Sequence, residues 1–358
     1  MRVLSVVGAR PQFVKLAPIA RAADGVVDHV IAHTGQHYDH NMSDAFFADL
    51  GIPHPDVNLG VGSGKHGEQT GAMLAGLEQV IEDTGPDWVL VYGDTNSTLA
   101  AAVAAVKLHV PVAHLEAGLR SFNRRMPEEH NRVLTDHAAD LLLAPTEVAM
   151  RHLATEGLAE RSVLVGDVMT DVLFQVRDAV ANRPLDLGVP VEPGEYYVST
   201  IHRPDNTDDP QRLRAILDGI AKVGKPVVLV AHPRLRALAE RHGIDLATGS
   251  ITAIEPLGYP QLVNAVIHSA GVLTDSGGLQ KESFLLRVPC TTLRPETEWV
   301  ETVELGWNVL VDNDFAALPA IVERPAPAPT EVAPYGDGHA ARDAVQALVD
   351  RPRSDVIH

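Results

Sequence analysis

Short apolar runs alternate with longer amphipathic segments along the first half of the chain. Six such runs, each followed by a helical pattern, are VLSVVG, HVIAHTG, WVLVYGD, VPVAHLE, DLLLAPT and SVLVGD. Uninterrupted apolar runs of this length are typical of strands that are buried on both faces. Their alternation with helical segments predicts a parallel sheet that is covered by helices.

The same alternation restarts in the second half of the chain, after a break. The break is the segment 181–194, ANRPLDLGVPVEPG, whose three prolines and two glycines indicate a domain linker just before or within it. Beyond it we expect the strands YYVSTIH, PVVLVAH, SITAI, AGVLTD and VPCTTLR. We therefore predict an α/β fold of two doubly wound Rossmann-like domains that face a cleft.

Length and composition fit this picture and exclude several classes of protein. The 358 residues exceed the size at which single cores usually divide. The formal charge of −18 argues against nucleic acid or an anionic membrane as a general partner. The single cysteine, Cys290, excludes an internal disulfide and a cysteine-rich zinc site. The N-terminus resembles a first strand rather than a signal peptide, and no apolar stretch has the length of a membrane span, so we expect a soluble cytoplasmic protein.

Polar residues directly follow the predicted strands, at the edge of the sheet where parallel α/β folds bind ligands. In the first half these residues are Arg10, Gln12, Lys15, Gln36, His37, Asp94, Glu116, Arg120 and Glu128. In the second half they are His202, Arg203, His232, Glu255 and the turn 274–282, TDSGGLQKE. The 17 histidines are scattered and show no H-E-x-x-H pair, which argues against a metal site.

The turn TDSGGLQKE joins a strand to a helix and is the motif with the simplest physical interpretation. Backbone amides at a helix start hold phosphate well, and an acid one turn later, here Glu282, can bind ribose hydroxyls. These features favour a nucleotide diphosphate as the ligand. The alternative is that Ser276, Gly277 and Gly278 only allow close packing of the helix on the strand.

Structural roles also compete with chemical ones at the other candidates. Asp94 precedes TNST and is suited to capping a helix. Glu128 is suited to the first turn of a helix, where the helix dipole favours an acid. A lone histidine such as His202 is more often a structural hydrogen bonder than a catalyst. Glu116 is harder to explain structurally, because it ends an apolar strand directly before an arginine-rich loop.

Taken together, the motifs resemble those of the non-hydrolysing UDP-N-acetylglucosamine 2-epimerases. The resemblance extends along the whole chain, through GARPQFVKLAPI, TGQHYDHNMSDAFF, VYGDTNSTLAAA, HLEAGLRS, MPEEHNR, HRPDNTDD, EPLGY, LTDSGGLQKE and RPETEWVETVELGWN. It implies the two-domain fold of one large class of glycosyltransferases (GT-B-like). The implied domains are residues 1–168, completed by a C-terminal helix over 339–352, and residues 169–338. Members of this family are usually homodimers.

The resemblance also implies the reaction, which converts UDP-GlcNAc to UDP-ManNAc. UDP is eliminated to give 2-acetamidoglucal and then adds back with inverted C2, and neither a metal nor a nicotinamide is required. The implied catalytic residues are Asp94, Glu116, Glu128 and His202. The implied substrate-binding and UDP-binding residues are Arg10, Lys15, Gln36, His37, Arg132, His232, Ser276, Gly277, Gly278 and Glu282.

One departure from the family pattern and several rival functions bear on these expectations. Gln12 stands where many members have glutamate, and we expect this lost charge to affect sugar recognition. The rivals are a hydrolysing 2-epimerase that releases ManNAc and UDP, an epimerase of a related UDP-sugar, a glycosyltransferase of the same fold, and a non-catalytic sensor of a UDP-sugar. A pure sensor would have no reason to keep the acids Asp94, Glu116 and Glu128 together with His202.

Overall fold

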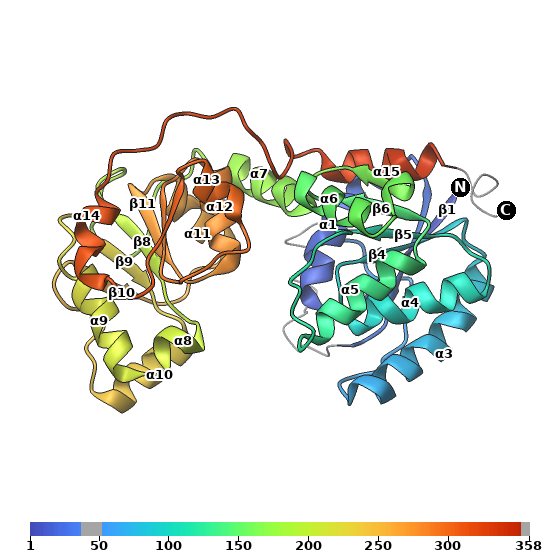
Figure 1. Cartoon of the computed structure of the whole chain (residues 1–358), viewed down its shortest axis with the longest axis horizontal. Helices are drawn as coiled ribbons and strands as arrows, with labels where there is room; N and C mark the ends of the chain where they lie inside the picture. The colour runs from blue at the N-terminus through green and yellow to red at the C-terminus, as the bar shows by residue number, and fades with distance from the viewer. Residues whose placement is uncertain (37–51, 352–358) are drawn as a thin grey trace. The chain divides into compact units, whose positions relative to one another are not determined.

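The computed structural model describes residues 1–36 and 52–351. The chain divides into two compact units (Figure 1). The first comprises Met1–Val172 and the segment that starts at Ala333, and the second comprises Leu173–Val332.

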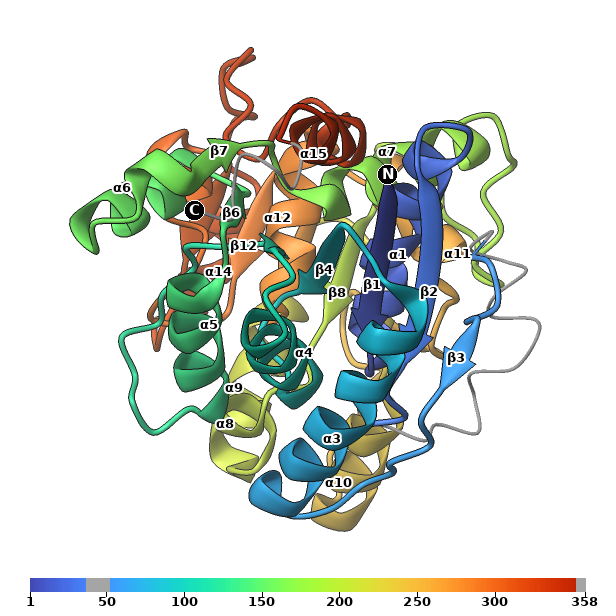
Figure 2. The same cartoon turned by 90° about the vertical axis from the view of Figure 1, so that its right-hand side faces the viewer.

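The first unit is built on a seven-stranded parallel sheet with the order β3-β2-β1-β4-β5-β6-β7. Its strands are β1 (Arg2–Val7), β2 (Asp28–His33), β3 (Val57–Asn58), β4 (Trp88–Tyr92), β5 (Val112–Leu115), β6 (Leu141–Ala144) and β7 (Ser162–Leu164). Figure 2 shows β1, β2 and β3 side by side. The helices between them are α1 (Arg10–Ala23), α3 (His66–Thr84), α4 (Asn96–Lys107), α5 (Pro127–Ala138) and α6 (Glu147–Thr155), with a 3-10 turn, η1 (Ala159–Arg161).

Both faces of this sheet are buried, which explains why its strands are apolar without interruption. Successive strand residues point to opposite faces. In β4, Leu90 joins one core cluster, with Phe13 and Leu16 of α1. Val89 and Val91 join the other cluster, which contains side chains of α3 and α4.

Helix α15 (Ala340–Val349) completes the first of these cores, although it lies near the end of the chain. Its buried side chains include Val345 and Leu348, and it contacts α1, as Figure 1 shows in red and blue. The Asp171 carboxylate caps it by accepting hydrogen bonds from the amides of Ala340 (3.0 Å) and Ala341 (2.8 Å). This cap satisfies amides that have no partner inside the helix.

The second unit repeats the design with a six-stranded parallel sheet of order β10-β9-β8-β11-β12-β13. Its strands are β8 (Tyr197–Thr200), β9 (Val227–Val230), β10 (Ile251–Ile254), β11 (Gly271–Thr274), β12 (Cys290–Thr292) and β13 (Asn308–Leu310). Its helices are α8 (Pro204–Thr207), α9 (Pro210–Ile220), α10 (Pro233–His242), α11 (Tyr259–Ile267), α12 (Gly277–Leu285), α13 (Val300–Glu304) and α14 (Leu318–Val322), with a 3-10 turn, η2 (Phe315–Ala317). The prediction of two doubly wound α/β domains is confirmed.

The first crossing between the units is a helix rather than a loop. The division at Val172–Leu173 falls inside α7 (Val168–Val180), whereas the proline-rich segment 181–194 belongs to the second unit. The return crossing lies against the start of α7, where the amide of Asp167 donates to the carbonyl of Tyr335 at 3.0 Å. Gly166 and Gly336 both adopt positive φ there, and a Cβ on either would lie 3.2–3.3 Å from the Cα of the other. No helix among the described residues has the length and apolar character to cross a membrane.

Candidate active site

Several of the predicted site residues lie where the strand order of each sheet reverses. In the first sheet β1 and β4 are neighbours although β2 and β3 intervene in the chain, and in the second sheet β8 and β11 are. The connections leave such a pair of strands in opposite directions, which opens a crevice at their carboxyl ends. Lys15 and Asp94 follow the first pair, and His202 and Ser276 follow the second.

Lys15 and Glu116 form an ion pair at the carboxyl edge of the first sheet. Burial disfavours the charged form of Lys15, but the carboxylates of Glu116, Asp167 and Asp94 outweigh burial and raise the pKa of the ammonium. The pair needs a glycine beside it. A Cβ on Gly93, whose φ is +60°, would lie 3.1 Å from a Glu116 carboxylate oxygen and 3.4 Å from Lys15 Nζ.

Both the side chain and the backbone of Asp94 are fixed by contacts with helix α5. The Asp94 carboxylate pairs with Arg132 of α5, and the Asp94 carbonyl accepts a hydrogen bond of 2.9 Å from the Asn131 side chain. Thr95, rather than Asp94, caps helix α4 by accepting from Thr98 N. The capping interpretation of Asp94 is therefore wrong, and its carboxylate is directed to α5 instead.

The two adjacent acids of PEE have different surroundings. Glu129 is 5% exposed and accepts hydrogen bonds from Ser121 N (2.9 Å), Ser121 Oγ (2.8 Å) and Phe122 N (2.9 Å). Burial would raise the pKa of Glu129, but these bonds and Arg132 hold it below its usual value. Glu129 thus anchors the arginine-rich loop, a role that we did not predict. Glu128 is exposed on the first turn of α5 and accessible to a ligand.

The side chains of Gln12 and Gln36, which follow β1 and β2, are buried inside the fold. Gln12 is 2% exposed, accepts from the amides of Gly8 and Ala9, and donates to the carbonyl of Tyr92 at 2.7 Å. The expectation that the missing charge at Gln12 affects sugar recognition is not supported, because the Gln12 side chain is occupied by hydrogen bonds inside the fold. Gln36 is also buried, and its side-chain oxygen accepts from Ser97.

Among the other basic candidates, Arg10 is exposed on the first residue of α1, at the carboxyl end of β1. His37, the neighbour of Gln36, lies outside the described residues. The substrate-binding roles of Arg10, Gln36 and His37 stay predictions.

The second unit contains a pocket of about 360 Å³ at the carboxyl edge of its sheet. Five of the predicted residues line it together: His202, His232, Ser276, Gly278 and Glu282. Its apolar wall includes Ile201, Val230, Leu257 and Leu262. A pocket with one apolar wall and a few convergent polar groups is typical of a small-molecule site.

His202 is oriented by a buried acid that the sequence analysis did not single out. Asp275 is 0% exposed, and its carboxylate lies 3.0 Å from His202 Nδ1. It also accepts from the amides of His202 and Arg203 and from the Asn206 side chain. Burial would raise the pKa of Asp275, but His202 and these hydrogen bonds lower it. With a proton fixed on Nδ1, the Nε2 of His202 is available to a substrate.

The turn after β11 combines a capped helix start with open space. Ser276 Oγ accepts from Leu279 N and caps α12. A Cβ added to Gly278 would meet no atom within 4 Å. The space beside Gly278 is therefore open, and a helix start stabilises a phosphate through its first amides.

Glu282 lies in the same pocket and is held by Tyr259, whose hydroxyl donates to a Glu282 carboxylate oxygen at 2.9 Å. Burial and the negative charge of Glu282 raise the pKa of Tyr259, so this hydroxyl remains a donor. His232 caps α10 through Nδ1, which accepts from Arg234 N at 3.2 Å, so its Nε2 carries the proton. The pocket thus offers an acceptor at Glu282 and donors at His232 and α12.

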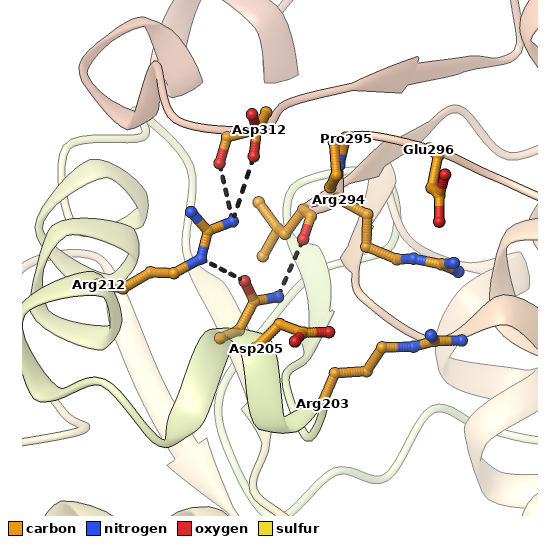
Figure 3. A pocket seen from close by; sticks show the side chains of 9 residues that line it. Arg203, Asp205, Arg212, Arg294, Pro295, Glu296 and Asp312 are labelled. Atoms are coloured by element: carbon orange, nitrogen blue, oxygen red, sulfur yellow. Dashed lines mark hydrogen bonds and ion pairs between the residues drawn. The ribbon is translucent and has the colours of Figure 1, made fainter. Parts of the chain in front are cut away.

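A second pocket, of about 330 Å³, lies in the same unit and is lined by three arginines (Figure 3). Arg212 is bound to Asn206 and Asp312. Figure 3 shows the side chains of Arg203 and Arg294 extending in the same direction, and both pair with Glu298. Acidic partners therefore compensate the arginine charges, and we assign no ligand to this pocket.

The described residues hold no group of three or more histidine, cysteine, aspartate or glutamate side chains that is suited to a metal ion. What the first unit does offer is a set of acids beside cations at one sheet edge. Carboxylates in such surroundings can accept and deliver protons. The second unit offers a pocket that combines an apolar wall with polar side chains and a helix start, and His202, which pairs with Asp275, is among its lining residues.

The chain is similar to known proteins of one family. Residues 20–349 match a family model described as UDP-N-acetylglucosamine 2-epimerase. The chain is 48% identical to a UDP-2,3-diacetamido-2,3-dideoxy-D-glucuronate 2-epimerase of Pseudomonas aeruginosa, over 90% of this chain and 91% of that protein. It is 43% identical to a UDP-N-acetylglucosamine 2-epimerase of Methanocaldococcus jannaschii, over 90% and 92% of the two chains.

A solved structure gives the same result at the level of the fold. The crystal structure of Methanocaldococcus jannaschii UDP-GlcNAc 2-epimerase in complex with UDP-GlcNAc and UDP is similar to this chain with a TM-score of 0.78. The two chains are 39% identical, and the match covers 98% of this chain and 100% of that one.

Proposed function

The chain belongs to the UDP-N-acetylglucosamine 2-epimerase family, and we propose that it is a non-hydrolysing member that interconverts UDP-GlcNAc and UDP-ManNAc. The single observation that carries this proposal is the retention of a full acid set at one sheet edge. Asp94 and Glu116 are each paired with a cation there, and Glu128 is exposed on the first turn of α5.

The reaction explains why acids are needed at this place. The C2 proton of the sugar is barely acidic, so its removal becomes feasible only as the bond between C1 and the phosphate oxygen breaks. One group takes the C2 proton while UDP leaves, which gives 2-acetamidoglucal. A proton is then delivered to the opposite face of C2 as UDP adds back to C1. Carboxylates can serve both steps and stabilise the positive charge that develops at C1.

The second unit supplies the residues that we propose for UDP. The open amides at the start of α12 bind the diphosphate, and Glu282 accepts hydrogen bonds from the ribose hydroxyls. His202, whose Nδ1–H is held by Asp275, presents Nε2 to the leaving phosphate and, once this nitrogen also carries a proton, donates to the phosphate oxygen. Support for a UDP-sugar comes from the solved relative that holds UDP-GlcNAc and UDP.

Proton and phosphorus NMR of the purified protein with UDP-GlcNAc in deuterated water tests the proposal. We expect UDP-ManNAc that carries deuterium at C2, with the phosphate ester intact at equilibrium. Accumulation of free ManNAc and UDP would instead identify a hydrolysing enzyme. If UDP-GlcNAc stays unchanged, this substrate assignment is wrong.

One observation favours a second candidate substrate. The Pseudomonas aeruginosa relative, 48% identical over 90% of this chain, is a 2-epimerase of UDP-2,3-diacetamido-2,3-dideoxy-D-glucuronate. Both substrates would exchange the C2 proton by the same route, so the same NMR experiment can be run with each of them. The two reaction rates can then be compared. The substrate with the larger kcat/KM is the one for which the site is built.

A further inference from the structure

Four buried or half-buried side chains form a line of alternating charges behind the proposed acids of the first unit. They are His114 of β5, Asp136 of α5, Arg120 of the loop after β5, and Glu156 at the end of α6. His114 and Asp136 are 0% exposed, and the Arg120 side chain is 2% exposed. Asp136 lies 2.7 Å from His114 and from Arg120, and Arg120 lies 2.7 Å from Glu156.

Both ring nitrogens of His114 face groups that can only accept hydrogen bonds. Nδ1 lies 2.7 Å from the Asp136 carboxylate, and Nε2 lies 2.7 Å from the carbonyl oxygen of Gly93. A neutral imidazole carries one N–H and can donate only once. The two bonds can form together only if His114 carries a proton on each nitrogen, which makes it an imidazolium.

The charge balance of the line favours the same state. Burying an unbalanced charge is costly, whereas a buried charge with a hydrogen-bonded partner is tolerated. With an imidazolium the line contains two cations and two anions, and its outer end, Glu156, is bonded at 3.0 Å to His137, a half-exposed histidine. Burial would raise the pKa of Asp136, but His114 and Arg120 lower it.

The line is attached to the backbone on which the proposed acids lie. Gly93, whose carbonyl accepts from His114, directly precedes Asp94. The other oxygen of Asp136 accepts from the amide of Gly118 at 3.1 Å, two residues after Glu116. Gly93, Glu116 and Gly118 all adopt positive φ, at 60°, 74° and 82°. For glutamate this conformation is strained and persists only where surrounding contacts hold it.

We propose that His114 is a doubly protonated positioning residue, which holds the ends of β4 and β5 so that Asp94 and Glu116 keep their places. It contacts no substrate atom in this role, because both of its nitrogens are occupied by Gly93 and Asp136. The positioning half of the inference rests on the proposed function, whereas the proton count does not.

Neutron diffraction from a deuterated crystal grown at neutral pH tests the proton count without any variant. We expect deuterons on both Nδ1 and Nε2 of His114. A ring with a single deuteron would overturn the inference. This readout is independent of activity, so it stands or falls separately from the epimerase assignment.

Steady-state kinetics of His114→Gln test the positioning half. We expect kcat to fall about tenfold or more, since small misplacements of reacting groups cost up to about a hundredfold, while UDP affinity stays unchanged. The matched control is His130→Gln, an exposed histidine on α5 that bonds only the Arg124 carbonyl among the described contacts. Asp136→Asn removes the counter-ion without removing the ring and should lower kcat in the same way. A normal kcat in either folded variant would overturn this half.

Discussion

The Nδ1 atom of His202 lies 3.0 Å from the carboxylate of Asp275, which is itself fully buried. Four donors converge on this carboxylate, all of them from the segment 202–206. The pair therefore fixes both the direction of the imidazole ring and the nitrogen that carries its proton. Such fixation matters for a histidine that has to present a defined nitrogen to a substrate.

Asp275→Asn should lower kcat about a hundredfold or more, because an amide no longer selects the required tautomer of His202. The affinity for UDP, measured by isothermal titration calorimetry, should change little. Asp205→Asn is the matched control, since Asp205 is exposed on the same segment. Equal activity in the two variants would show that His202 needs no orienting acid.

Glu116→Gln should abolish most of the turnover and leave UDP binding near normal. The expected loss is about a hundredfold or more, the usual contribution of a general acid or base. Asp94→Asn should behave alike. Glu68→Gln, an exposed acid on α3, is the control for a lost surface charge. If the first two variants lose UDP affinity but keep their chemistry, the assignment of the acids is wrong.

We expect Glu282 to recognise the ribose of UDP by accepting hydrogen bonds from its hydroxyls. We expect wild-type protein to bind UDP about tenfold more tightly than 2′-deoxy-UDP, because hydrogen bonds to a charged group contribute about 1.5 to 3 kcal/mol. In Glu282→Gln this ratio should shrink, whereas in Tyr259→Phe it should persist, since the carboxylate remains. Calorimetry with both nucleotides and all three proteins checks this, and an unchanged ratio in Glu282→Gln would remove Glu282 from the UDP site.

Much of the fold was predictable because central strands such as β4 are buried on both faces and are followed by a helix. The strands that we missed, Val57–Asn58 and Asn308–Leu310, are two and three residues long, which is too short for a period to be visible. The composition did not indicate the change of unit inside α7, whereas the family resemblance implied a boundary nearby, between residues 168 and 169. The sequence of α7, VMTDVLFQVRDAV, contains no glycine or proline that would indicate a boundary.

The candidate site was predictable only in part. Position after a strand selected Lys15, Asp94 and His202 correctly as residues at the sheet edge, but it also selected Gln12, which turns inward. The acids that hold the site were missed, because their roles depend on partners far away in the chain. Asp136 meets His114 across 22 positions, and Asp275 meets the amide of His202 across 73.

The two last apolar residues of α15 should differ sharply in their effect on stability. Leu348 is 1% exposed in the core of the first unit, whereas its neighbour Val349 is 40% exposed. Leu348→Ala should lower the free energy of unfolding by about 2 to 5 kcal/mol, the usual cost of such a cavity. Val349→Ala should change it by less than about 0.5 kcal/mol. Urea unfolding followed by circular dichroism measures both, and equal effects would contradict the docking of α15.

Acid should remove the stability that the buried carboxyl of Asp275 contributes. Burial raises its pKa, but His202, the amide of Arg203 and the Asn206 side chain outweigh burial and hold the pKa below its usual value in the folded chain. A lowered folded pKa means that the contribution is complete above the unfolded pKa of about 3.9 and is lost as the pH falls through the folded one. The urea midpoint of wild-type protein should therefore exceed that of Asp275→Asn by a constant amount from about pH 6 to pH 4.5. Below about pH 4 the difference should shrink, because the Asp275 carboxyl of wild-type protein is then protonated, whereas the asparagine amide of the variant does not titrate. A difference that stays constant down to about pH 3 would show that Asp275 titrates alike in both states.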